Sequence, residues 1–263
     1  MGFATANNQA IQASDSEFVA TLNNDTRVEP GWLDALIEAM DTHPKVGMCA
    51  SKMLFAGRRN VINSAGIAID RAGIAWDRLG GRSDDADETA LQPVFGPCAG
   101  AALYRRAMLD QIGLFDEDFF AYMEDVDLAW RGQLAGWKAL YVPRARVYHH
   151  HSATGKEGSP FKNRQLGRNK VWLIAKNYPM PYLLAYLPVI VGLDLAAVGY
   201  ALLARREWSA LQGRLDGLLG LAKMIKKRRP TYRGGDVWRA LARIEMPGKI
   251  LERYRHIRES QSR

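Results

Sequence analysis

The sequence predicts an α/β protein in which helices flank an open mixed β-sheet and a helical region follows. Short strand-like runs alternate with helical segments over residues 1–178, and this order is typical of an α/β sheet. Hydrophobic residues make up 48% of the 263-residue chain, which is enough for a sizeable core. Beyond residue 178 the chain becomes apolar and then basic. We therefore expect an α/β domain over 1–178 and a basic helical region over 179–263.

The first quarter of the chain predicts a helix, a strand, a helix and a second strand. Residues 7–14 have helical character, and residues 18–22 (FVATL) are typical of a buried strand. Pro30 suits a first helical turn, and apolar residues then recur at helical spacing as far as Met40. Residues 46–55 alternate loosely and predict the next strand. A polar corner, Asn23 to Asp25, thus separates the first strand from the second helix.

The middle of the chain predicts a hairpin and a polar loop. Residues 67–69 and 74–76 flank the sequence DRAG, in which Gly73 supplies the permissive backbone of a turn. An acidic loop follows over residues 83–89.

The remainder of the α/β domain predicts further strands and two helices. Residues 93–106 are typical of a glycine-containing strand, and a short helix around Met108 to Ile112 ends at a glycine. A loop then leads into a helix from about Glu124. Residues 138–143 and 146–152 are the last strand-like pieces.

The C-terminal region combines a long apolar run with an amphipathic segment. Residues 180–204 are long enough to cross a bilayer, although Pro181, Pro188 and Asp194 interrupt them. Residues 208–225 place leucines on one side, with cations at their end, as in helices that lie in a membrane interface. The alternative is a helical hairpin that packs on the domain or on a second subunit.

Charge and cysteine content narrow the class of protein. The net charge is +8, and the cations gather late in the chain, from Arg205 onward. Without a recognisable binding motif or aromatic residues among these cations, specific nucleic-acid binding is not expected. The N-terminus lacks the pattern of a secretory signal, and the two distant cysteines match no metal or redox spacing. We expect a cytoplasmic protein, peripheral or monotopic at the inner face of the cell membrane.

Asn23, Asn24 and Asp25 form the first polar cluster with chemical potential. They follow a predicted strand, and ligands of open α/β sheets bind beyond the carboxyl ends of strands. Carboxylate and amide oxygens suit Mg²⁺ or Mn²⁺, which often bridges a protein carboxylate to substrate phosphates. The alternative is a turn that caps the following helix.

Two further clusters contain acids and histidines. Glu124, Asp125 and Asp127 crowd the start of a predicted helix, where backbone amides favour ionised carboxylates, the state that a general base requires. Ordinary first-turn acids would explain one or two of the three. The YHHHS run, residues 148–152, could supply one imidazole as a metal ligand. We expect these three clusters to come together around one divalent cation.

The order and spacing of four motifs resemble a family-2 glycosyltransferase of the GT-A fold, in its rhamnosyltransferase-like branch. The motifs are LNNDT.VEPGWL, G.AL.RR..L..IG.FDE.FF.Y.EDVDL..R....G, VP...V.HH and a following RN. The resemblance covers about residues 2–178. It implies that the chain begins after the strand-helix-strand unit that normally carries the nucleotide pocket.

The resemblance also implies roles for particular residues. Asp25 would be the metal ligand, with Asn23 and Asn24 beside it in the sugar-diphosphate site, and His149 would complete the Mg²⁺ or Mn²⁺ site. Asp125, or after it Glu124, would be the catalytic base. The other implied site residues, which would line the sugar pocket or close over the diphosphate from a flexible region, are Gly100, Ala101, Arg168 and Asn169.

The resulting hypothesis is an inverting, metal-dependent transferase that moves a sugar from a nucleotide-diphosphate donor, with dTDP-rhamnose as a candidate. The acceptor would be a lipid-linked or cell-surface glycan, as in cell-wall or O-antigen polysaccharide synthesis. The alternative is a catalytically silent, membrane-associated remnant that binds a glycan, a lipid or a partner transferase. A homo-oligomer is compatible with either hypothesis.

Overall fold

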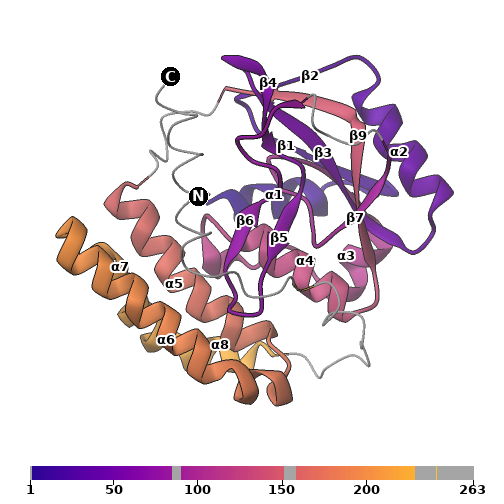
Figure 1. Cartoon of the computed structure of the whole chain (residues 1–263). Helices are drawn as coiled ribbons and strands as arrows, with labels where there is room; N and C mark the ends of the chain where they lie inside the picture. Colours follow the sequence, from indigo (N-terminus) through magenta and orange to yellow (C-terminus); the bar gives the residue numbers. More distant parts are fainter. Residues whose placement is uncertain (1, 85–89, 151–157, 229–240, 242–263) are drawn as a thin grey trace.

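The computed structural model confirms the predicted fold class, a mixed sheet flanked by helices and followed by C-terminal helices (Figure 1). The structure describes residues 2–84, 90–150, 158–228 and 241. Most of the predicted acidic loop, residues 85–89, lies outside this range, as do His151 and Ser152 of the histidine run. The boundary drawn at residue 178 stays a prediction.

Within the described residues, the main sheet has seven strands in the path β1-β8-β3-β9-β2, with β4 paired to β3 and β7 paired to β9. β3 and β9 run parallel, and the other pairs are antiparallel. The strands are β1 (Phe18–Leu22), β2 (Thr26–Val28), β3 (Val46–Phe55), β4 (Arg58–Ser64), β7 (Gln92–Val94), β8 (Ala101–Arg105) and β9 (Lys138–His149). The predicted hairpin forms a separate pair, β5 (Ile67–Ile69) and β6 (Ala75–Asp77), with Gly73 at φ 74° in its turn.

The first strand is present but is not buried as predicted. β1 pairs with β8 along one side and ends the described strand path, so much of its surface stays open. Leu22 is 45% exposed, and Thr21 is the buried residue of the strand. An apolar run indicates a strand, but its place in the sheet decides which side chains are covered.

The last two predicted pieces, 138–143 and 146–152, are largely one strand. β9 pairs with β3 along its length, and the register shifts where Val142 faces Ser51 and Arg146 faces Lys52. Pro143 lies in the shifted stretch, where its missing N–H removes no regular ladder bond. The bulge therefore explains why the sequence pattern broke into two pieces.

The two faces of the sheet carry separate hydrophobic clusters. α2 (Trp32–Thr42) covers one face, where it packs on residues such as Cys49 and Leu103. The other face, with Met48 and Tyr104, is covered by α1 (Phe3–Gln12), α3 (Arg106–Ile112) and α4 (Glu124–Leu134). A short 3₁₀ helix, η2 (Glu117–Phe119), precedes α4. Helices therefore cover both faces of the sheet.

The C-terminal part contains α5 (Pro160–Asn177), α6 (Met180–Arg205), α7 (Ser209–Leu219) and α8 (Leu221–Lys226), which lie together beside the sheet domain (Figure 1). A Cβ on Gly213 would lie 2.2 Å from the carbonyl of Arg164, so glycine permits α5 and α7 to approach closely. The predicted amphipathic segment is two helices that meet at Gly220, where a Cβ would strike Trp172.

α6 is the one helix of the described chain that is long and apolar enough to cross a membrane. Its most apolar stretch has a mean hydropathy of 2.0, and 17% of that stretch is buried. The aspartate that interrupts the run, Asp194, faces inward and pairs with Lys170 of α5 and Arg214 of α7, each at 3.0 Å. The outward side of α6 therefore presents apolar side chains without this charge.

Candidate functional site

Asp25 and His149 meet at one end of the sheet. Asp25 follows β1, and His149 is the last residue of β9, which pairs with β2 so that Thr26 lies opposite His149. The backbone N–H of His150 donates to the carbonyl of Asp25 at 2.8 Å. The Asp25 carboxylate and the His149 imidazole are thereby brought to 3.3 Å, measured from Oδ1 to Nε2.

Asn63 of β4 orients the imidazole, and the sequence analysis missed this residue. His149 Nδ1 lies 2.9 Å from Asn63 Oδ1, so in neutral imidazole Nδ1–H donates to that oxygen. Nε2 then presents its lone pair to the Asp25 carboxylate, an arrangement that a shared cation or a second ring proton satisfies. Asn63 has no motif around it, and only the pairing of β4 with β3 brings it near.

The residues fit a divalent cation with few protein ligands. Two atoms bound at about 2.1 Å to one octahedral ion and at right angles lie roughly 3 Å apart, close to the observed separation of Asp25 and His149. Within the described residues, no group of three or more His, Cys, Asp or Glu side chains could hold a metal. A Mg²⁺ or Mn²⁺ ion here would therefore take its other ligands from water and substrate oxygens.

The glycine-containing segment before β8 joins the first cluster to the acidic pair. The N–H of Asn23 donates to the carbonyl of Gly100 at 2.9 Å, and a Cβ on Gly100 would lie 3.2 Å from the Asn23 amide. Ala101 is buried and pairs with Leu22, whereas Asn24 is exposed in the turn. The segment before β8 thus lies against the turn that follows β1.

Asp125 lies beside this same segment. Its Oδ2 accepts from the N–H of Ala99 at 3.2 Å, and its Oδ1 accepts from the N–H of Val126 at 2.8 Å. Ala99 directly precedes Gly100, whose carbonyl binds Asn23, so the structure brings the first two clusters together through one loop.

The two adjacent carboxyl groups differ from ordinary acids. Burial and the charge of Asp125 raise the pKa of Glu124 to about 8, so this side chain is largely protonated at neutral pH. Burial also raises the pKa of Asp125, against the N–H groups of Ala99 and Val126, which favour its ionised form. Asp125 is therefore the better candidate for a base, and Glu124 for a hydrogen-bond donor.

Asp127 belongs to a different, structural group. Although burial opposes ionisation, Lys176, Arg131 and Asn177 lower the pKa of Asp127 to about 2. Its oxygens accept from Lys176 and Arg131 at 2.9 Å and from Asn177 at 2.7 Å. This network joins α4 to α5, in agreement with the view that first-turn acids need not all be catalytic.

Arg168 and Asn169 lie inside helix α5 rather than in the flexible region expected from the sequence. The guanidinium of Arg168 stacks on Trp172 at 4.4 Å and donates to the carbonyl of Phe119 at 2.9 Å. Asn169 is fully buried against the same segment. Both side chains thus contact the segment that leads into α4, and a role at the diphosphate stays a prediction.

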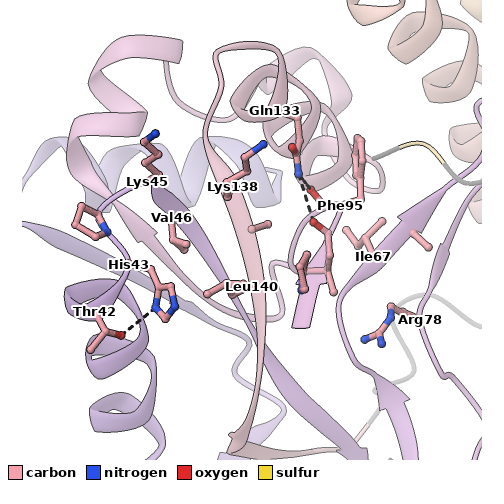
Figure 2. A pocket seen from close by; sticks show the side chains of 15 residues that line it. Thr42, His43, Lys45, Val46, Ile67, Arg78, Phe95, Gln133, Lys138 and Leu140 are labelled. Carbon is pink, nitrogen blue, oxygen red and sulfur yellow. Dashed lines mark hydrogen bonds between the residues drawn. The ribbon is translucent and has the colours of Figure 1, made fainter. Parts of the chain in front are cut away.

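A cavity of about 860 Å³ lies at the other end of the sheet (Figure 2). Its walls include His43, Lys45 and Lys138, where α2 ends and β3 and β9 begin. No residue of the three clusters lines this cavity. We therefore place the candidate site at the end that holds Asp25, Asp125 and His149.

Comparison with solved structures identifies the fold as that of GT-A glycosyltransferases. A crystal structure of GalNAc-T7 with UDP, GalNAc and Mn²⁺ matches 66% of this chain and 34% of its own, with a TM-score of 0.51 and 18% identity. A sequence profile described as glycosyl transferase family group 2 matches residues 18–205. The chain belongs to this family of transferases, as the sequence motifs predicted.

Two curated proteins are similar in sequence to this chain. The chain is 31% identical over 181 residues to the N-acetylglucosaminyl-diphospho-decaprenol L-rhamnosyltransferase of Mycobacterium tuberculosis, a match that covers 60% of this chain and 58% of the relative. It is 28% identical over 167 residues to the O-antigen biosynthesis protein RfbC of Myxococcus xanthus, covering 58% of this chain and 12% of RfbC. The chain is thus similar in sequence to a rhamnosyltransferase and to an O-antigen biosynthesis protein, and its match spans little more than half the length of the first relative.

Proposed function

We propose that the α/β domain transfers a sugar, with inversion, from a nucleotide-diphosphate donor to a lipid-linked or cell-surface glycan. Family membership and the names of the relatives support this class of reaction, and dTDP-rhamnose is the first donor to test. The observation that carries the proposal is the contact of Asp25 with His149 at the sheet end where Asp125 accepts from Ala99.

In the proposed reaction, Asp125 accepts the proton of the acceptor hydroxyl while that oxygen attacks the anomeric carbon. Attack comes from the face opposite the nucleotide, the bond to the diphosphate oxygen breaks, and the diphosphate leaves with the bonding electrons. Glu124, protonated near pH 7, can donate a hydrogen bond beside Asp125. The bond from the Asn23 N–H to the Gly100 carbonyl holds the turn that carries Asp25 against the loop that contacts Asp125.

Asp25 and His149 would hold a Mg²⁺ or Mn²⁺ ion. When bound, such an ion offsets the charge that develops on the departing diphosphate. Asn63 keeps the imidazole in the tautomer that directs Nε2 toward Asp25. The Mn²⁺ in the GalNAc-T7 structure agrees with divalent metal use in this fold.

Replacing the proposed base tests the reaction directly. We expect Asp125→Asn to lower transfer by about 100-fold or more, the range that general base catalysis contributes. The assay measures labelled sugar transfer from a panel of nucleotide sugars, including dTDP-rhamnose, to a polyprenyl-diphosphate-linked acceptor. Asp110→Asn, an exposed acid on α3, is the matched control and should retain activity. Full activity of Asp125→Asn would exclude this residue as the base.

Metal and nucleotide binding can be measured separately from activity. We expect Mn²⁺ together with a nucleoside diphosphate to raise the thermal unfolding midpoint, because ligands that bind only the folded state stabilise it. Asp25→Asn and His149→Ala should each abolish the Mn²⁺-dependent part of this shift. A shift that survives both substitutions would place the metal elsewhere. Absence of any shift would favour the silent-remnant alternative.

We further propose that the chain acts at the cytoplasmic face of the membrane, with α6 to α8 in contact with lipid. The exposed apolar side of α6 and the exposed cations Arg205, Arg206 and Lys226 support this location. Contact with a bilayer would place the α/β domain close to a lipid-linked acceptor.

A further inference from the structure

The segment that leads into α4 has an unusual backbone. Phe120, Tyr122 and Met123 have positive φ angles of 63°, 68° and 67°, although none is glycine. L-residues seldom adopt this region, and a run of them persists only where the surroundings impose it. The next two residues are Glu124 and Asp125. The direction of both carboxyl groups therefore depends on whatever holds this segment.

The side chain of Asn169 in α5 contacts the backbone of this segment at several carbonyl groups. Its Nδ2 group lies within hydrogen-bond distance of three carbonyl oxygens, those of Phe119 at 3.1 Å, Ala121 at 2.9 Å and Tyr122 at 2.7 Å. Its Oδ1 accepts from Arg168 Nε at 2.9 Å, which fixes the orientation of the amide. Asn169 has 0% exposure, so removing its amide would take this donor from the carbonyls of Ala121 and Tyr122, whereas the Phe119 carbonyl would keep Arg168 and the Ala121 N–H.

We propose that Asn169 is a positioning residue, whose carboxamide holds residues 119–123 in the backbone conformation, with positive φ at Phe120, Tyr122 and Met123, that directs Asp125 into the site. This inference rests on the proposed function of Asp125 as the base. Arg168 reinforces the arrangement through its own bond to the Phe119 carbonyl at 2.9 Å. Arg168 and Asn169 thus act on Glu124 and Asp125 through the backbone of residues 119–123, although α5 is distant from these residues in the sequence.

The first test measures hydrogen exchange in the full-length chain and needs no activity. The N–H groups of Phe119, Phe120 and Ala121 are hydrogen-bonded within the segment, so their exchange reports its opening. We expect Asn169→Ala and the isosteric Asn169→Asp to speed their exchange by roughly tenfold or more, because each removes the side-chain donor to the carbonyls of this segment. Amides of β3 and β9 should exchange at wild-type rates.

A matched control separates local opening from general destabilisation. Asn177 is also buried in α5, but its amide donates to Asp127 rather than to residues 119–123. Asn177→Ala should therefore lower stability without selective exchange at Phe119 to Ala121. Unchanged exchange there in the Asn169 variants, or equal acceleration throughout the chain, would overturn the inference.

The second test uses kinetics per folded molecule. We expect the Asn169 variants to lower kcat by about 10- to 100-fold with the donor KM unchanged, because misplaced catalytic groups cost rate rather than binding. Loss of folded protein alone would not produce this split. If Asp125→Asn proves active, the proposed base is wrong while the exchange result still stands. If Asp125→Asn is inactive but the Asn169 variants keep wild-type kcat, the positioning role is wrong and the proposed function survives.

Discussion

Glu124 and Asp127 lie in the first turn of the same helix, yet their surroundings shift the two carboxyl groups in opposite directions. Burial and the neighbouring Asp125 charge raise the pKa of Glu124 to about 8. Asp127 is equally enclosed, but Lys176 and Arg131 lower its pKa to about 2. These buried carboxyl groups thus divide into Asp127, which is paired with cations, and the Glu124–Asp125 pair, which we propose for acid–base chemistry.

The raised pKa of Glu124 predicts a pH-dependent stability. Between the ordinary value near 4.5 and about 8, the unfolded chain loses this proton while the folded chain keeps it, so stability falls as pH rises. Glu124→Gln removes this loss. We expect the urea midpoint of Glu124→Gln to match the wild type most closely near pH 5 and to exceed it increasingly toward pH 8. The exposed control Glu38→Gln should show no such trend, and a pH-independent difference for Glu124→Gln would contradict the assignment.

At the scale of single elements, the sequence pattern did not predict α5, although this helix is 18 residues long. Polar side chains occupy several of its buried positions beside apolar ones such as Trp172 and Leu173, and they break the apolar period on which the prediction of a helix depends. Asn169 contacts carbonyls before α4, Lys176 pairs with Asp116 and Asp127, and Lys170 pairs with Asp194. Each of these buried polar groups has a partner on another element, so the helix is specified by tertiary contacts.

Asp194 of α6 forms a partly buried ion-pair group with Lys170 and Arg214. Although burial opposes ionisation, Lys170 and Arg214 lower the pKa of Asp194. We expect Asp194→Asn to reduce the unfolding free energy at pH 7 by about 1–3 kcal/mol, because two partly buried cations lose their carboxylate. Asp216→Asn, which breaks the more exposed pair with Arg164, should change stability little. Equal effects of both substitutions in urea unfolding would contradict a special role for Asp194.

At the scale of the whole molecule, the apolar surface and the positive charge lie on the C-terminal helices. Leu184, Leu195 and Leu203 of α6 are 65%, 68% and 86% exposed. Lys223 of α8 and Lys227, which follows α8, pair with Asp116 and Asp118 at the start of η2, at 2.5–2.7 Å, so neither cation is free for lipid. Arg205, Arg206 and Lys226 are exposed cations beside the apolar surface. This combination matches an anionic lipid surface.

Vesicle flotation tests this surface. We expect the chain to float with phosphatidylglycerol vesicles more than with neutral phosphatidylcholine vesicles, and high salt to weaken the difference because it screens exposed charges. Leu195→Ser combined with Leu203→Ser should reduce flotation without lowering stability, since both side chains are exposed. Ala→Ser at the exposed Ala20 of β1 is the control. A stable dimer in light scattering that the double variant dissociates would instead assign the surface to a second copy.

The sequence by itself determined the fold class and the family, and it predicted most of the residues around which the candidate site is proposed. Periodic apolar runs predicted β3, the β5–β6 hairpin and the helices α2 to α4, because in these segments the local pattern agrees with burial. The motifs around Asp25, Glu124 and His149 carried the family resemblance, which the family profile confirmed. The roles of these residues stay predictions.

Only the tertiary structure decided which groups meet and what their surroundings do to them. Strands β2 and β7 are three residues long and form by pairing with β9. β1 pairs only with β8 among the described strands, which leaves much of it exposed. His149 contacts Asn63, and Asn169 donates to the carbonyl of Tyr122, although these partners are far apart in the chain. The opposite pKa shifts of Glu124 and Asp127 likewise depend on burial and on Lys176, which lies on another helix. Burial and charge pairing arise between elements, so no local pattern of residues records them.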